Sequence, residues 1–176
     1  MRKVLPKSFF ERNTVMVAQE LLGKFLVRKI GVREIVAKIV ETEAYDGAED
    51  KAAHGSHGKT PRNEVLFEEA GRFYVYFVYG MHWLLNIVCG RRDFPAGVLI
   101  RGVEIEGLRL DGPAKLTKFL KIDKSFNGKL AAKDISLWFE DRGLKIKKDQ
   151  IASSKRIGVD YAGEWADKLY RFYLKR

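Results

Sequence analysis

Cysteine is almost absent from this sequence, which has only Cys89 among its 176 residues. One cysteine cannot form a disulfide within the chain, so the fold must be stable without one. Cys89 lies in the apolar run LLNIVCG, and we expect it to be a small buried side chain.

Long hydrophobic runs are also missing. No apolar segment approaches the roughly 20 residues that a membrane-spanning helix needs. The first residues, MRKVLPKSFFERN, lack the apolar core of a signal peptide. These absences predict a soluble cytoplasmic protein that is neither secreted nor bound to a membrane.

No internal repeat, low-complexity tract or linker rich in proline and serine divides the chain. Hydrophobic residues make up 46% of the sequence, which is enough for one sizeable core. We therefore expect a single domain over residues 1–176, and nothing in the sequence requires more than a monomer.

Several catalytic signatures are absent as well. The sequence has no glycine-rich phosphate-binding loop, no Rossmann fingerprint and no serine nucleophile elbow, so nucleotide-driven and acyl-transfer chemistry are not indicated. His54 and His57 could together invite a metal, but two histidines need a further ligand, and no Cys/His cluster or HExxH helix accompanies them. A metal-dependent hydrolase stays a weaker alternative.

Positive charge is present in excess. Lys and Arg total 33 against 23 Asp and Glu, which gives a formal net charge of +10. Such an excess favours a polyanionic partner, because basic side chains near phosphates release condensed counterions. No long basic amphipathic helix is visible, so nucleic acid is a better candidate partner than a membrane surface.

Strand-like segments dominate the chain. Runs rich in valine, isoleucine and aromatic residues predict strands, and two shorter patterns predict helices. The expected strands are KFLVRKI and REIVAKIVETEAY around Gly31, FYVYFVYG and MHWLLNIVCG as a hairpin around Gly80, AGVLIRGVEI, ISLWFE and LYRFYLKR. The expected helices run from Asn13 or Thr14 through MVAQELL to Gly23, and from Asp111 through AKLTKFLKI. The pattern predicts an α+β fold, with a curved, mainly antiparallel sheet, flanking helices and a long ordered loop at 46–64.

The segment VETEAY carries the first candidate site. Side chains alternate along a strand, so Glu41, Glu43 and Tyr45 share one face. A carboxylate beside a tyrosine could act as a general base toward water. For any one glutamate, the residues alone favour the simpler interpretation of a solvated strand end.

A second candidate is the loop AAHGSHGKTPRN. His54 could orient a base or a sugar by hydrogen bonding. Lys59, Thr60, Arg62 and Asn63 supply donors suited to phosphate oxygens. An ordinary solvated loop explains the same residues equally well.

The aromatic hairpin is the third candidate. Tyr74 and Tyr76 share one face, an arrangement that usually belongs to a core. Tyr79 precedes Gly80 at the expected tip, where an exposed aromatic ring could insert between base pairs. Two polar residues in apolar strands, Asn86 and Arg101, need buried partners or a ligand.

Taken together, these segments resemble the alkyladenine (3-methyladenine) DNA glycosylase family of base-excision repair. The resemblance is carried in order by KIVETEAYDGAEDKAAH, TPRN, FYVYFVYGMHWLLNI, VLIRGVEI, DGPAKLTKFLKIDKSFNG and RIGVDYAGEWADKLYRFYL, which span nearly the whole chain. It implies a monofunctional DNA glycosylase that flips alkylated or deaminated purines from double-stranded DNA. The enzyme would hydrolyse the N-glycosidic bond and leave an abasic site. It also implies a protruding hairpin that enters DNA, no metal, no cofactor and, in a prokaryotic cell, association with the nucleoid.

The resemblance also implies roles for single residues. Glu43 would activate the attacking water, and Arg101 would help to hold that water. Tyr45, His54 and Tyr76 would form the pocket for the flipped base.

Further roles concern selectivity and the DNA surface. Asn86 would crowd the exocyclic amine of normal guanine, and Tyr79 would fill the space that the flipped base leaves. Contacts with the DNA backbone are expected from Thr60, Arg62, Met81 and His82.

Three segments depart from the pattern of the animal members of this family. GSHGK is shorter, CGRRDFPAG differs in length and is strongly basic, and His82 replaces a tyrosine. These departures leave the phosphate contacts open. A non-catalytic lesion-DNA binding protein on the same scaffold is the main alternative function, since it would keep Tyr79 and the basic surface.

Overall fold

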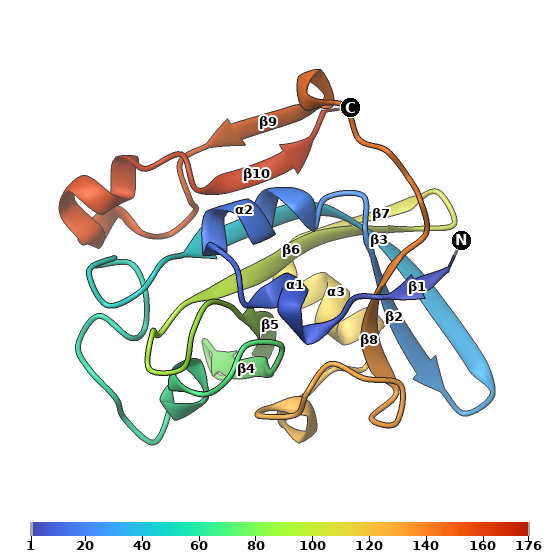
Figure 1. The fold of residues 1–176 in the computed structure, drawn as a ribbon, viewed down its shortest axis with the longest axis horizontal. Coiled ribbons are helices and arrows are strands. Elements are labelled where there is room, and N and C mark those ends of the chain that lie inside the picture. The colour runs from blue at the N-terminus through green and yellow to red at the C-terminus, as the bar shows by residue number, and fades with distance from the viewer. Residues whose placement is uncertain (1, 176) are drawn as a thin grey trace.

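A curled antiparallel sheet organises the chain into an α+β structure shaped like half of a barrel (Figure 1). The structure is a computed structural model that describes residues 2–175. Within that range the sheet has ten strands: β1 Lys3–Val4, β2 Phe25–Ile30, β3 Arg33–Tyr45, β4 Phe73–Val78, β5 His82–Val88, β6 Gly97–Ile105, β7 Leu108–Asp111, β8 Leu137–Asp141, β9 Ile151–Ser154 and β10 Arg171–Leu174.

The strands follow the order β1-β8-β2-β3-β6-β5-β4, with β7 beside β6 and β9 beside β10. The long strand β3 is central because it pairs with β2 along its first half, with β6 along its second half and with β10 at residues 41–43. The curved antiparallel sheet expected from the sequence is therefore confirmed.

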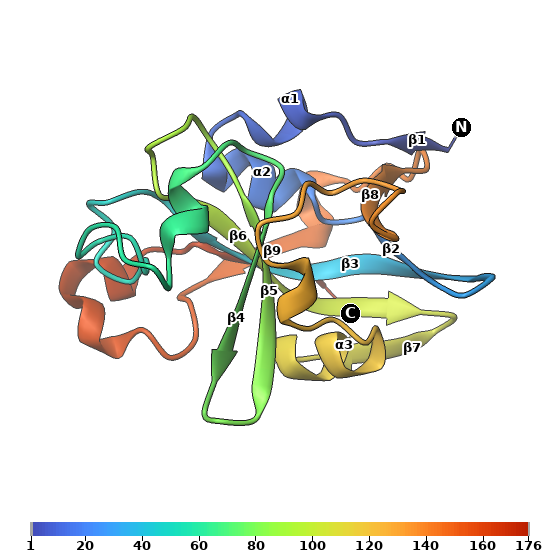
Figure 2. The same cartoon turned by 90° about the horizontal axis from the view of Figure 1, so that it is seen from below.

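Short helices flank this sheet. They are α1 Lys7–Phe10, α2 Thr14–Glu20 and α3 Pro113–Phe119, with 3-10 turns η1 Glu64–Phe67, η2 Lys124–Phe126, η3 Lys148–Gln150 and η4 Asp160–Asp167. Figure 2 shows α1 and α2 on one side of β3 and α3 on the other. None of the helices within residues 2–175 has the length and apolar character to span a bilayer.

The helix boundaries follow local sequence. Asn13 caps α2 as expected, because its side chain accepts the backbone N–H of Met16 at 3.1 Å. The second helix begins later than expected. Gly112 is its N-cap and Pro113 its first residue, whereas Asp111 ends β7, a short strand that the sequence pattern did not reveal.

Strand β3 changes the face that it presents to the main core. Ile39 belongs to that core, and four residues later the alternation would place Glu43 on the same side. Instead, the pairing register is irregular between Ile39 and Thr42. Beyond this point Ala44 belongs to the core, and the Thr42 hydroxyl donates to a carbonyl of α2 at 2.8 Å. The irregularity therefore directs Glu41 and Glu43 away from the main core.

Strand β6 changes phase at the same level. Ile100 lies in the main core, and so does Val103 three residues later. With strict alternation, only the even-numbered residues of this strand would face the core. Because both strands shift together, their pairing resumes its earlier register. Arg101 is thereby placed on the same side of the sheet as Glu43.

A buried ion pair fastens the C-terminal segment to the loop after β3. Both Arg156 and Asp50 have fully buried side chains, and the guanidinium donates to both carboxylate oxygens at 2.5 and 2.9 Å. Arg156 also donates to the carbonyls of Ala44 and Trp165. This buried pair holds the two segments together, because separating its partners would leave a buried charge without compensation.

Removing one partner of this pair should weaken the fold strongly. We expect Asp50→Ala to lower the free energy of unfolding by about 3–5 kcal/mol, because an uncompensated guanidinium stays buried. Urea unfolding followed by circular dichroism measures the change. Lys155→Ala, which removes an exposed ion pair with Asp167, is the matched control and should change little. Equal effects of the two variants would contradict the structural role of Asp50.

Candidate active site

A cavity of about 370 Å³ lies beside the hairpin of β4 and β5. Its wall combines side chains from β3, the following loop, both hairpin strands, β6 and η4: Tyr45, His54, Tyr76, Asn86, Arg101 and Tyr161. This volume falls within the range of roughly 300–1,000 Å³ that is typical of small-molecule sites. Five of these six residues were expected at a base pocket or a catalytic centre from the sequence.

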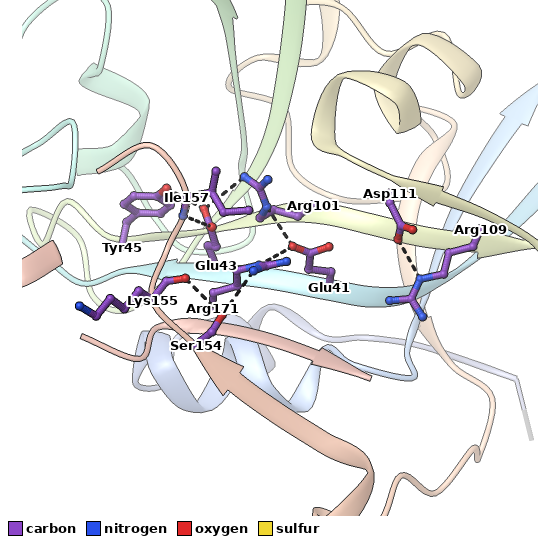
Figure 3. Close-up of polar contacts among 10 residues, drawn as sticks. All are labelled: Glu41, Glu43, Tyr45, Arg101, Arg109, Asp111, Ser154, Lys155, Ile157 and Arg171. Carbon is purple, nitrogen blue, oxygen red and sulfur yellow. Dashed lines mark hydrogen bonds and ion pairs between the residues drawn. The ribbon is translucent and has the colours of Figure 1, made fainter. Parts of the chain in front are cut away.

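The carboxylate of Glu43 lies directly behind this wall. It has no exposed surface, and three residues that line the cavity contact it (Figure 3). The Tyr45 hydroxyl donates to Oε2 at 2.9 Å, and the backbone N–H of Ile157 donates to Oε1 at 2.8 Å. Arg101 Nη1 lies 3.5 Å from Oε2.

Burial raises the pKa of Glu43 above its ordinary value, because desolvation penalises the ionised carboxylate. The Arg101 charge and the hydrogen bonds from Ile157 and Tyr45 oppose this rise in pKa, while the charge of Glu41 adds to it. The result is a carboxylate that can be ionised and that accepts a proton more readily than an exposed glutamate.

A cluster of aromatic rings from the hairpin and the loop after β3 forms another part of the cavity wall. Tyr74 and Tyr76 stack with ring centroids 5.2 Å apart, and the His54 ring meets Tyr76 edge-on at 4.5 Å. The Tyr74 hydroxyl and His54 Nδ1 form a hydrogen bond of 2.9 Å. This places Tyr74 in the site as the residue that orients His54, a role that its shared face with Tyr76 could have indicated from the sequence.

The histidine at this wall is uncharged near neutral pH. Burial and the nearby positive charge of Arg62 both lower the pKa of His54. Burial raises the pKa of Tyr74 to about 12, so that its hydroxyl stays protonated. A neutral imidazole hydrogen-bonded to a phenol offers its other ring nitrogen to a ligand.

Asn86 is a buried residue of the cavity wall. It lies opposite Tyr74 in the hairpin register, and its Nδ2 donates to the Tyr74 carbonyl at 3.2 Å. The side chain is buried, which resolves the question of how an apolar strand accommodates an amide.

The tip of the hairpin exposes Tyr79. This side chain is 89% exposed and lies at a turn that the Met81 N–H to Val78 carbonyl bond closes at 3.1 Å. Both central residues have positive φ angles, 53° at Tyr79 and 65° at Gly80, as in the hairpin turns that match strand twist. Figure 2 shows the hairpin of β4 and β5 extending away from β3. A large ring is thus held in water rather than in the core.

The family model described as methylpurine-DNA glycosylase matches residues 8–176 of this chain. The chain belongs to the methylpurine-DNA glycosylase family.

Relatives of similar length support this assignment of the methylpurine-DNA glycosylase family. A protein of Clostridium perfringens is 44% identical, with 97% of this chain and 95% of the relative covered. One of Methanocella arvoryzae is 44% identical, with 98% and 92% covered, and one of Legionella pneumophila strain Lens is 45% identical, with 99% and 96% covered. Each of these relatives carries the name "Putative 3-methyladenine DNA glycosylase".

In this member of the methylpurine-DNA glycosylase family, the residues expected at the DNA backbone lie at different places. His82 lines the main cavity, and Met81 is exposed beside the hairpin tip. Thr60 and Arg62 line an adjoining hollow of about 260 Å³, and Arg62 Nη2 also donates to the Phe77 carbonyl at 3.2 Å. Within residues 2–175, no group of three His, Cys, Asp or Glu side chains could hold a metal ion.

Sequence reasoning missed two contributors to this methylpurine-DNA glycosylase site. The first is the backbone N–H of Ile157, which contacts Glu43 although the two are 114 residues apart. A backbone donor leaves no signature in the residue type. The second is Tyr161, an exposed ring of η4 that lines both hollows.

The raised pKa of Glu43 has a consequence for stability. A carboxyl group whose pKa is higher in the folded state stabilises that state below its unfolded pKa, and this contribution is lost as pH rises through the folded pKa. We therefore expect Glu43→Gln to unfold at a higher temperature than the wild type at pH 8, with a gain that shrinks toward pH 4. Calorimetry at several pH values measures it.

Glu34→Gln is the control for this measurement, because Glu34 is exposed near the start of the same strand. A lower melting temperature of Glu43→Gln at pH 8 would show that the buried carboxylate is instead a net stabiliser.

Proposed function

We propose that the protein is a monofunctional DNA glycosylase that removes damaged purines from double-stranded DNA. The observation that carries the proposal is the buried carboxylate of Glu43 behind an aromatic cavity, with Arg101 beside it. Membership of the methylpurine-DNA glycosylase family and the names of the relatives support the same reaction.

Substrate binding begins with extrusion of the damaged nucleotide, since the glycosidic carbon cannot be reached inside a duplex. Unstacking costs on the order of a few kcal/mol, least for a damaged base. Insertion of the exposed ring of Tyr79 and attraction between phosphates and the net charge of +10 would offset that cost.

The cavity suits an alkylated purine because its walls are aromatic. Tyr45 and Tyr76 present ring surfaces, and His54 adds a neutral imidazole at the edge of Tyr76. A cationic base over such rings gains roughly 0.5–2 kcal/mol from each favourable contact. This is modest, so rejection of normal purines also needs a clash, which we assign to Asn86 in the cavity wall.

Hydrolysis then needs one carboxylate and one water molecule. Ionised Glu43 takes a proton from water as the water oxygen bonds to the sugar carbon, and the breaking carbon–nitrogen bond leaves its electron pair on the base. The carboxylate also stabilises positive charge that develops on the sugar. None of the described residues that line the cavity is a lysine, so hydrolysis is favoured over a Schiff-base mechanism that cleaves the strand.

Replacement of the carboxylate should separate binding from chemistry. We expect Glu43→Gln to slow single-turnover release of 3-methyladenine from duplex DNA by roughly 100- to 10,000-fold, the range for loss of a general base. Binding of the same duplex should stay near that of the wild type. In the wild type, the release rate should fall as pH drops through the raised pKa of Glu43, because the protonated carboxyl cannot accept a proton.

Two outcomes would reject this reaction. Lesion binding without base release by the wild type would indicate the non-catalytic DNA-binding alternative. Release that a chelator abolishes would indicate the metal-dependent alternative with His54 and His57.

Insertion of the hairpin tip can be tested separately. We expect Tyr79→Ser to weaken binding to lesion-containing duplex by roughly 10- to 100-fold, the loss of about 1–3 kcal/mol that one stacked ring supplies. Binding to the single strand should change much less, since no stack is left to fill. Fluorescence anisotropy measures both affinities.

Val32→Ser is the matched control, because Val32 is a fully exposed apolar residue between β2 and β3, at another hairpin turn. Equal loss of affinity for duplex and single strand in Tyr79→Ser would argue against insertion.

A further inference from the structure

A second buried carboxylate, Glu41, lies two residues before Glu43 on the same face of β3 (Figure 3). One oxygen of Glu41 accepts from two arginines: Arg101 Nε at 3.1 Å and Arg171 Nε, from β10, at 2.7 Å. The Glu41 side chain is only 7% exposed, so it depends on these cations for its charge compensation.

Arg101 connects the two carboxylates. Its Nε contacts Glu41, and its Nη1 lies 3.5 Å from Glu43. Arg101 also lines the main cavity, whereas Glu41 and Arg171 line a separate hollow on their other side. The contact of Arg101 with Glu41 is shorter than its contact with Glu43, so Glu41 positions the guanidinium beside Glu43.

The residue opposite Glu41 leaves space for its side chain. The register partner of Glu41 on β6 is Gly102, at the irregularity in pairing between β3 and β6. A Cβ atom at Gly102 would lie 3.1 Å from Glu41 Cβ and 3.4 Å from its Oε2. Irregular strand pairing of this kind redirects side chains, and here it leaves room for a carboxylate beside Arg101.

The cluster is balanced in charge. Glu41 and Glu43 supply two negative charges, and Arg101 and Arg171 supply two positive ones. If Arg171 were missing, Glu41 would draw Arg101 away from Glu43 and would oppose ionisation of Glu43 by like-charge repulsion. An isolated structural ion pair would have no such link to the cavity.

We propose that Glu41 and Arg171 are positioning residues for the excision reaction: Arg171 neutralises Glu41, and Glu41 holds the Arg101 guanidinium between the cavity and Glu43. The inference rests on the proposed function, because it assigns these residues to the same catalytic carboxylate. It predicts that the charges of Glu41 and Arg171 act on Glu43 in opposite directions.

Other groups near Glu43 are the same in every variant compared. On its own strand this is Tyr45, and Arg101 comes from β6. Tyr76 of β4 interacts with Glu43 electrostatically, and the Arg156 guanidinium lies 4.8 Å from the Tyr45 ring centroid. A change in the titration of Glu43 in the variants below therefore reports on Glu41 and Arg171.

The test titrates Glu43 in the free protein by carbon-13 NMR of labelled glutamate, with Glu43→Gln identifying its signal. We expect Glu41→Gln to lower the pKa of Glu43, because a negative neighbour is removed and Arg101 and Arg171 lose their other partner. Arg171→Met should raise the pKa of Glu43. The double variant should return it toward the wild-type value, and Arg171→Lys should shift it less than Arg171→Met.

Base release supplies the second measurement. Glu41→Gln and Arg171→Met should each slow single-turnover release roughly 10- to 100-fold, because a misplaced guanidinium disturbs the reacting geometry. The acid limb of the pH–rate profile should move to lower pH in Glu41→Gln and to higher pH in Arg171→Met. Lys38→Met is the control. It removes a cation of β3 that pairs with Glu104, and it should leave the rate and the titration unchanged.

The inference would be overturned if the pKa of Glu43 shifted in the same direction in both variants, or shifted in neither. The proposed function would still hold in that case if the wild type released the base. Absence of base release by the wild type would overturn the proposed function instead, and the titration in the free protein would still decide whether Glu41 and Arg171 control Glu43.

Discussion

The burial of the Glu43 carboxylate is the constraint around which this site is arranged. An ionised carboxylate without water is unfavourable unless hydrogen bonds and an opposite charge replace its hydration. The chain supplies these from three distant segments: a tyrosine on the same strand, a backbone N–H before η4 and an arginine of β6. The residues that provide these three groups also line the cavity, so the same residues compensate the charge of Glu43 and form the pocket.

Two irregular strands make that arrangement possible. Because β3 and β6 change phase at the same level, both strands contribute apolar residues to the main core before and after the irregularity. The same change directs Glu43 and Arg101 to the other face, beside the cavity. A regular strand pair would direct Glu43 toward the core face that Ile39 occupies. The resemblance noted from the sequence singled out Glu43, but strict alternation along β3 does not predict the side of the sheet on which its side chain lies.

The aromatic residues divide into two groups according to the hairpin register. Phe73 and Val75 face the main core, while Tyr74 and Tyr76 line the cavity. The alternation in the sequence indicated that these two pairs lie on opposite faces, but it did not indicate which face lines a cavity. The tip residue Tyr79 can belong to neither group, because the turn places it beyond both faces. Recognition surfaces and core therefore come from the same short strands, and separating them requires only the two-residue periodicity of a strand.

The sequence by itself determined the class of fold, most of the strands, the cap of α2, the aromatic hairpin and the family, because these depend on local periodicity, turn residues and long motifs. It missed the short elements β1, α1, β7 and β9 and misplaced the start of α3 at Asp111, since such short elements contain too few residues to show a pattern. Only the tertiary structure decided which groups meet Glu43. The Ile157 amide, the Asp50–Arg156 pair and the contact from Arg171 to Glu41 join residues more than 100 positions apart. Such contacts follow from how the sheet curls and where β10 returns to β3, and no local pattern encodes them.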